Sequence, residues 1–232
     1  MARSASGGGV IRRMIPAIVI GLAGCAVLVW LGVWQVQRLA WKTEILDHIE
    51  TMLAADPVAV PADPDPARDR YRRVIEAGSV EPGELHVYTS VPGRGVGYRV
   101  IVPFRLADGR LILLDRGFVP IGEKDAPRRL GPLRVRGSLA WPDETDGYTD
   151  APDREKNIWF ARDVELMSAA LGTLPVMLVT EASDDPAAPF AMPVGVDISN
   201  DHLQYAITWF GLAIAWAGMT VYWLWRIGRR TD

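Results

Sequence analysis

Two apolar segments that contain no charged residue constrain the fold of this 232-residue chain more than any other feature. They are residues 14–34 and 203–225, which are 21 and 23 residues long. At a rise of ~1.5 Å per residue, a helix of this length crosses a hydrocarbon core of ~30 Å. Helices buried in soluble domains are rarely apolar on every side. We therefore expect a membrane protein in which two transmembrane α-helices flank a single domain.

Basic residues beside the two segments predict their orientation. Arg12 and Arg13 precede the first segment, and three arginines follow the second. These three are Arg226, Arg229 and Arg230. Because cytoplasmic flanks are rich in Lys and Arg, we expect residues 1–13 and 226–232 in the cytoplasm and residues 35–202 outside it.

The acidic charge of the region between the segments limits its partners. Apart from the arginines near the two termini and Asp232, the chain has 19 basic and 27 acidic residues, a net charge of −8. Nucleic-acid binding requires clustered Lys and Arg, so we expect no nucleic-acid partner. Cys25 is the only cysteine, which excludes an intramolecular disulfide. The stretch LAGC resembles a lipoprotein cleavage site, but the apolar segment continues beyond Cys25, which favours an uncleaved anchor.

The region between the segments predicts an α+β domain. Helical periodicity continues after the first segment to about residue 55, and a Pro-rich extended connector follows. From Tyr71 the period changes to two, and Asp108-Gly109 predicts a hairpin turn, with Pro103 marking an edge or a bulge. NIWF at 157–160 is expected as a strand, followed by a short helix that ends at Gly172 and by another strand. We expect a mainly antiparallel sheet or a small barrel with one short helix.

Several chemistries find little support in the sequence. Three histidines and one cysteine, far apart, do not match a closed zinc site, and no P-loop is present. His86 lies in an expected strand with no nucleophile elbow nearby, and we interpret it as an exposed strand histidine. Arg99 and Asp115 lie on the two arms of the hairpin, where they form either an ion pair that closes it or a contact surface.

Five stretches of sequence together resemble a known family. They are LGVWQVQRLAWK (31–42), YRRV (71–74), VPFRLADGRLILLDRGFVP (102–120), NIWFARD (157–163) and NDHLQYAITWF (200–210). In this order, between two membrane segments, they resemble the Surfeit-locus-one family (Surf-one or Shy-one) of cytochrome c oxidase assembly factors. The resemblance covers about residues 31–225. Phe118 departs from the tryptophan that usually follows DRG in the family, which puts only an indole N–H contact in doubt.

The resemblance implies a non-enzymatic role in building the haem-A-containing oxidase. It implies that the chain binds haem A, that His202 is an axial ligand of the iron, and that the partner is the catalytic oxidase subunit, with haem A synthase or other assembly factors as further partners. The alternative is a cofactor-free chaperone that stabilises an oxidase intermediate. The acidic composition and the short N-terminus, without an Arg- and Ser-rich leader, favour the bacterial inner membrane, with residues 35–202 in the periplasm.

Helical spacing places His202 at the head of an aromatic stripe. The stripe consists of His202, Tyr205, Trp209, Ala213, Trp216, Thr220 and Trp223. It either forms an interfacial aromatic belt or receives the apolar face of a haem bound by His202. Arg38 and Lys42 lie just outside the first segment and either neutralise haem propionates or extend to lipid headgroups. The second axial ligand is unassigned, and His48 is one candidate.

Small residues predict how the helices pack. Ala17, Gly21 and Cys25 follow each other at every fourth position of the first segment, as do Gly211 and Ala215 of the second. These faces either pack against each other or bind the oxidase subunit.

Overall fold

The computed structural model describes residues 7–195 and 201–229. Residues 1–6 and 196–200, and Arg230 of the predicted cytoplasmic end, lie outside the described residues, as does the side chain of Arg13. The chain divides into two compact units. One combines residues 1–47 with residues 197–232, and the other is His48–Val196.

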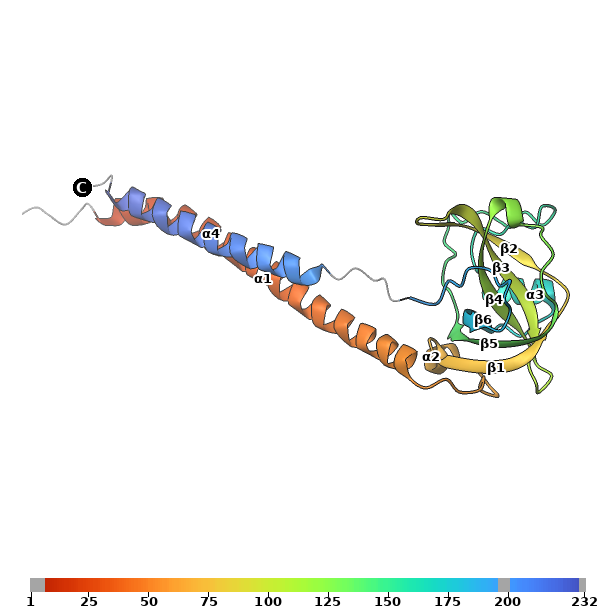
Figure 1. Ribbon diagram of the computed structural model, residues 1–232. Coiled ribbons are helices and arrows are strands. Elements are labelled where there is room, and N and C mark those ends of the chain that lie inside the picture. Colours follow the sequence, from red (N-terminus) through yellow and green to blue (C-terminus); the bar gives the residue numbers. More distant parts are fainter. Residues whose placement is uncertain (1–6, 196–200, 230–232) are drawn as a thin grey trace, which may run out of the picture. The chain divides into compact units, whose positions relative to one another are not determined.

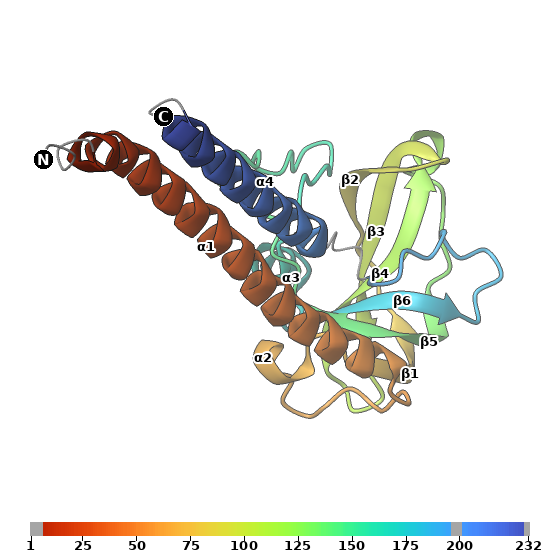
Figure 2. The same cartoon turned by 90° about the vertical axis from the view of Figure 1, so that its left-hand side faces the viewer.

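Two long helices form the first unit, except that the last seven residues of the first helix belong to the second unit. Helix α1 (Gly7–Ala54) has 48 residues and α4 (His202–Arg229) has 28. They lie side by side and antiparallel, with the N-terminal end of α1 beside the C-terminal end of α4 (Figures 1 and 2). Both are long and apolar enough to cross a membrane, and α1 runs to Ala54 as the extended helical periodicity predicted.

Glycines of α1 allow the two helices to approach closely. A Cβ atom built on Gly21 would lie closer than 3.0 Å to the Thr220 side chain, and one on Gly24 would lie equally close to the Trp216 indole. Gly32 has the same relation to the Phe210 ring. The helices therefore pack with small residues of α1 opposite large residues of α4, a pattern common in membrane helix pairs.

Only half of the small-residue prediction is confirmed. Gly21 is buried in the pair, and the thiol of Cys25 lies 3.9 Å from the carbonyl oxygen of Ala213. Gly211, by contrast, has open space where a Cβ would stand, and Ala215 is exposed. Helix α4 instead contributes Ala206 and Ala213, both buried. Residues seven apart return to nearly the same face of a helix, whereas the pair at 211 and 215 lies on a different face.

A six-stranded mixed sheet forms the second unit. Its strands are β1 (Arg73–Val80), β2 (Leu85–Val91), β3 (Gly95–Arg105), β4 (Leu111–Pro120), β5 (Gly131–Ala140) and β6 (Met177–Ser183). The strand order is β1-β5-β6-β4-β3-β2, and β1 also pairs with β3 through Ser79 and Val80. The hydrogen-bonded ladder therefore returns to its first strand. Helix α3 (Val164–Leu171) precedes β6, and a 3₁₀ turn, η1 (Ile121–Glu123), follows β4.

The prediction of a mainly antiparallel sheet is confirmed, and the sheet contains one parallel pair. Strands β4 and β6 are parallel over Leu113–Asp115 and Met177–Val179, so the sheet is mixed. A parallel partner requires a long crossover, and the segment that contains α3 supplies it. NIWF is not a strand: it makes only isolated bridges, Asp153 with Ile158 and Val87 with Trp159. Asn157 has a left-handed backbone (φ 50°), which turns the chain before a ladder can form.

The predicted short helix is confirmed, and its ends have a clear cause. The side chain of Asp163 accepts a hydrogen bond from the backbone N–H of Leu166, which caps the first turn of α3. Gly172 ends the helix in a left-handed conformation (φ 68°). Between these caps, Val164 and Met167 are buried against the apolar residues of the sheet.

The hairpin of β3 and β4 is confirmed and forms the centre of the fold. Gly109 adopts φ 89° in the turn, as the Asp-Gly pair predicted. Pro103 lies between Ile101, the last residue that pairs with β2, and Phe104, which pairs with β1. Proline has no backbone N–H to donate, and Pro103 lies at the point where β3 changes its partner from β2 to β1. The bulge itself is at Val100 and Ile101.

Buried ion pairs cross the sheet. The Arg99 Nε donates to Asp115 Oδ2 at 2.7 Å, so the ion-pair interpretation is confirmed, although the pair lies within the strands and does not close the hairpin end. Arg162 bridges Asp115, at 3.4 Å, and Glu144. Burial raises the pKa of Glu144, but the hydrogen bonds and charge of Arg162 outweigh it, so that the pKa is lowered. Residues distant in sequence are thus fixed by a network rather than by one pair.

His86 is buried, which contradicts its interpretation as an exposed strand histidine. Its Nε2 lies 2.6 Å from Glu84 Oε1 and its Nδ1 lies 3.3 Å from the Asn157 amide nitrogen. Both ring nitrogens are occupied by polar partners in the second unit. The sequence around His86 does not reveal this burial, because the residues that contact the ring from outside β2, Tyr98 and Asn157, lie on other segments.

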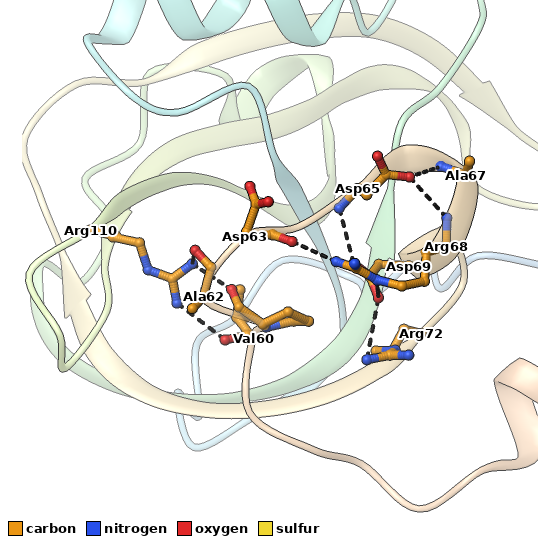
Figure 3. A network of polar contacts seen from close by, with 10 residues as sticks. Val60, Ala62, Asp63, Asp65, Ala67, Arg68, Asp69, Arg72 and Arg110 are labelled. Carbon is orange, nitrogen blue, oxygen red and sulfur yellow. Dashed lines mark hydrogen bonds and ion pairs between the residues drawn. The ribbon is translucent and has the colours of Figure 1, made fainter.

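The connector between α1 and β1 is ordered by polar contacts and contains a helix that the sequence did not predict. Helix α2 (Pro66–Asp69) is capped by the carboxylate of Asp65. The fully buried carboxylate of Asp69 accepts hydrogen bonds from Arg68 and pairs with Arg72 at 3.2 Å (Figure 3). Arg68 lowers the pKa of Asp69 chiefly through this hydrogen bond. Arg110 donates to consecutive backbone carbonyls at 60–62 and so holds the connector against the hairpin turn (Figure 3).

Candidate functional site

The first residue of α4, His202, is joined to α1 by a hydrogen bond. Its Nδ1 lies 2.7 Å from Oε1 of Gln35. The Gln35 side chain is buried, with 9% of the residue exposed, whereas His202 is half-buried. A buried amide is stable only when it is hydrogen-bonded, and His202 supplies the partner across the helix pair.

The middle of the aromatic stripe packs against α1. Trp216 lies against Gly24, Ala213 against Cys25 and Thr220 against Gly21. The indole Nε1 of Trp216 is buried and has no hydrogen-bond partner among the described residues. A tryptophan far from either end of the segment thus has a packing role, which neither interpretation drawn from the sequence anticipated.

The remaining aromatic residues of the stripe are more open, including Tyr205 and Trp209, which were predicted to contact the cofactor. Tyr205 and Trp223 are 55% and 50% exposed, and Trp209 is half-buried. Tyr205 lies within the first turn of α4, close in sequence to His202. The structure therefore leaves Tyr205 accessible beside the histidine and places Trp216 in the helix interface.

Arg38 and Lys42 extend the face of α1 that carries Gln35. They lie three and seven residues after it, which places all three side chains within an arc of about 60°. The Arg38 guanidinium lies 4.6 Å from the centre of the Trp41 ring. Lys42 is half-buried. His48, the candidate second ligand, is exposed and lies thirteen residues after Gln35 on the same helix.

Gln35 is the site residue that sequence reasoning missed. It lies one residue beyond the first charge-free segment, and His202 lies one residue before the second. In an antiparallel pair these two ends are adjacent. A polar residue at each of these ends was the available signal, but a sequence separation of 167 positions hid it.

The residues at this site suit a metal ion that is already coordinated by a non-protein ligand. Within residues 7–195 and 201–229, no three His, Cys, Asp or Glu side chains form a group that could hold a metal ion. With Gln35 Oε1 as acceptor, the proton of a neutral His202 is on Nδ1, and Nε2 carries the lone pair. A porphyrin supplies four nitrogen donors, so one such imidazole is enough for an axial ligand. His202 therefore fits haem iron.

Comparison with known proteins decides the family. The sequence model of the SURF1 family matches residues 22–214, most of the chain. The chain belongs to the SURF1 family. It is 30% identical over 226 residues to Surfeit locus protein 1 of Takifugu rubripes, which covers 87% of this chain and 90% of the relative. Surfeit locus protein 1 of Rattus norvegicus is also 30% identical, over 94% of this chain and 74% of its own length. A SURF1-like protein of Drosophila melanogaster is 32% identical, over 87% of this chain and 72% of its own length.

The SURF1 match includes both sides of the candidate site. Gln35 and His202 lie inside the matched range, as do Arg38, Lys42 and Tyr205. Trp216 lies just beyond its end at residue 214. The SURF1 relationship therefore extends over the hydrogen-bonded pair, and the family resemblance seen in the five sequence stretches is confirmed.

Proposed function

We propose that this SURF1 protein is a membrane-anchored, non-enzymatic assembly factor for haem-A-containing cytochrome c oxidase. It binds haem A through His202 and assists its insertion into the catalytic subunit, alone or with haem A synthase and other assembly factors. Helices α1 and α4 lie in the bacterial inner membrane, both termini are cytoplasmic, and the domain between the helices is periplasmic.

Exposed apolar side chains support the membrane assignment. In the most apolar windows of α1 and α4, only 11% and 6% of the residues are buried. A core helix of a soluble protein would be mostly buried, and soluble proteins rarely expose large contiguous apolar patches. Lipid tails solvate such a surface. The antiparallel arrangement also agrees with arginines at both predicted cytoplasmic ends.

The contact between Gln35 and His202 carries the haem proposal. It commits Nδ1 of His202 to α1 and leaves Nε2, which has no hydrogen-bond partner among the described residues, for iron. Arg38 and Lys42 continue the same face of α1 by about one and two turns, where cations can pair with the carboxylates of haem. When bound, haem A supplies the iron and the formyl-substituted porphyrin that the oxidase uses.

One observation favours the alternative, a cofactor-free chaperone. Trp216 and Ala213 are used for packing against α1, so the middle of the stripe is not a free surface for a porphyrin. In this alternative, the exposed apolar faces of α1 and α4 hold the oxidase subunit, and His202 only joins the two helices.

An optical spectrum of the purified full-length protein, after co-expression with haem A synthase, separates these functions. We expect the wild type to carry haem A and His202→Ala to lose it. Gln204→Ala, which changes an exposed residue of the same helical turn, should retain it. A wild type without haem A under these conditions would refute the haem role. Normal oxidase levels in cells with His202→Ala would then favour the chaperone.

A further inference from the structure

The buried amide of Gln35 has a role that neither helix packing nor family membership assigns. Among the described side chains of α1, it is the only polar one that is buried. The neighbouring faces of α1 expose apolar residues such as Val33, Trp34 and Val36. A polar group in such surroundings is costly unless its hydrogen bonds are made, so its partner is specific.

The chemistry of the two contacting atoms fixes a proton. Oε1 of Gln35 is a carbonyl oxygen and only accepts hydrogen bonds, and it lies 2.7 Å from Nδ1 of His202. The proton between them therefore belongs to Nδ1. In the neutral imidazole the other nitrogen, Nε2, is then unprotonated and can donate its lone pair to a metal.

We propose that Gln35 is a positioning residue that holds His202 in the Nδ1–H tautomer and so presents Nε2 to haem iron. The inference rests on the proposed haem function and extends it to a residue on the other helix. Histidines that bind metals usually donate the second ring N–H to a carbonyl or carboxylate, which fixes the orientation of the ring and increases its basicity. Here the carbonyl is a side chain from α1.

This arrangement makes the orientation of the His202 ring depend on the pairing of α1 with α4. His202 begins α4, and its orienting partner belongs to α1. Separation of the helices would remove the acceptor, free the ring to rotate and release it to the other tautomer. Haem binding and helix pairing therefore stabilise each other, as linked equilibria must.

The first test needs no haem. In the full-length protein labelled with ¹⁵N-histidine in detergent micelles, long-range ¹H–¹⁵N spectra report the tautomer of each of the three histidines. His202→Ala identifies the signal. We expect the Nδ1–H form in the wild type and in Gln37→Leu, which changes an exposed glutamine two residues away. In Gln35→Leu the signal should shift toward the Nε2–H form. A proton on Nε2 in the wild type would overturn the inference.

The second test measures ferric haem A binding by the same variants. Loss of an orienting partner typically weakens metal binding about 10- to 100-fold, and we expect this for Gln35→Leu but not for Gln37→Leu. Equal affinity of Gln35→Leu and the wild type would overturn the role of Gln35 and leave the haem function intact. Failure of the wild type to bind haem A would refute the proposed function itself. Alkylation of Cys25 in each variant checks that the helices remain paired.

Discussion

Replacement of Gly21 by alanine tests whether α1 and α4 pack as the structure shows. The added Cβ would lie closer than 3.0 Å to Thr220, whereas ordinary contact begins near 3.4 Å. Thr220 is β-branched, and its hydroxyl donates to the carbonyl of Trp216 at 2.8 Å, so it cannot easily rotate away. Overpacking of this kind costs about 1–3 kcal/mol.

Gly211→Ala is a matched control, because it changes helix propensity in the same way as Gly21→Ala but creates no steric clash. Both glycines lie inside apolar helices, and in both the change to alanine improves helix propensity by about 1 kcal/mol. At Gly211, however, no atom of the described residues outside its own stretch of helix lies within 4 Å of the new Cβ. The difference between the two variants therefore isolates the overpacking energy, about 1–3 kcal/mol, or at least about fivefold in the equilibrium between paired and separated helices.

Cys25 provides the assay, since it is the only thiol in the chain and is half-buried beside Ala213. The full-length protein in mild detergent is titrated with dodecyl sulfate, and the rate of Cys25 alkylation reports separation of the helices. We expect Gly21→Ala to be alkylated at a lower dodecyl sulfate fraction than Gly211→Ala. Adding Thr220→Ala, which removes the two closest atoms, should restore the midpoint. Identical midpoints for Gly21→Ala and Gly211→Ala would refute the packing.

Three further predictions concern the second unit and are checked by chemical unfolding of the full-length protein in detergent. Asp69→Asn should cost roughly 2 kcal/mol at neutral pH, because it removes the charge of a buried carboxylate that accepts hydrogen bonds from the exposed Arg68 and pairs with the half-buried Arg72. The folded-state pKa of Asp69 is lowered, so its ionised carboxylate contributes fully to the free energy of unfolding above about pH 4. This contribution is lost as the pH falls through the lowered pKa. The variant should therefore lose less stability in acid than the wild type. Gly117→Ala should cost at least about 2 kcal/mol, because φ is 111° and the new Cβ would clash with the carbonyl of Phe190, and a cost near zero would contradict the structure. Asp163→Ala should cost about 1 kcal/mol through loss of the cap of α3, and Asp163→Asn should recover most of it.

Local patterns predicted the parts of the fold that local physics controls. The charge-free segments gave both long helices, and Asp108-Gly109 gave the central hairpin because a left-handed glycine suits its turn. The antiparallel partners of β1 and β6 and the parallel pairing of β4 with β6 depend on contacts between distant segments. The alternation of apolar and polar residues along one strand does not determine which strand it pairs with, so these pairings were not predicted.

The same limit applies to the candidate site. A motif identified His202, but its environment comes from Gln35, 167 residues away. His86 shows the reverse case: its place in a strand predicted exposure, but the ring is buried against Tyr98 and Asn157 from other segments. For both histidines, the partners that decide what the ring can do lie on other elements.

The packing of Trp216 changes how variants of the aromatic stripe must be interpreted. Its indole fills the space above Gly24, so Trp216→Ala opens a cavity in the helix pair and loosens the geometry that joins Gln35 to His202. Haem loss in that variant would follow from weaker pairing even without any contact between the indole and a porphyrin. Tyr205 is exposed and lies outside this interface, so haem loss in Tyr205→Ala with unchanged Cys25 alkylation would indicate direct contact. A haem-binding surface on this helix pair is therefore best sought around His202 and Tyr205, at the end of α4 where packing leaves side chains free.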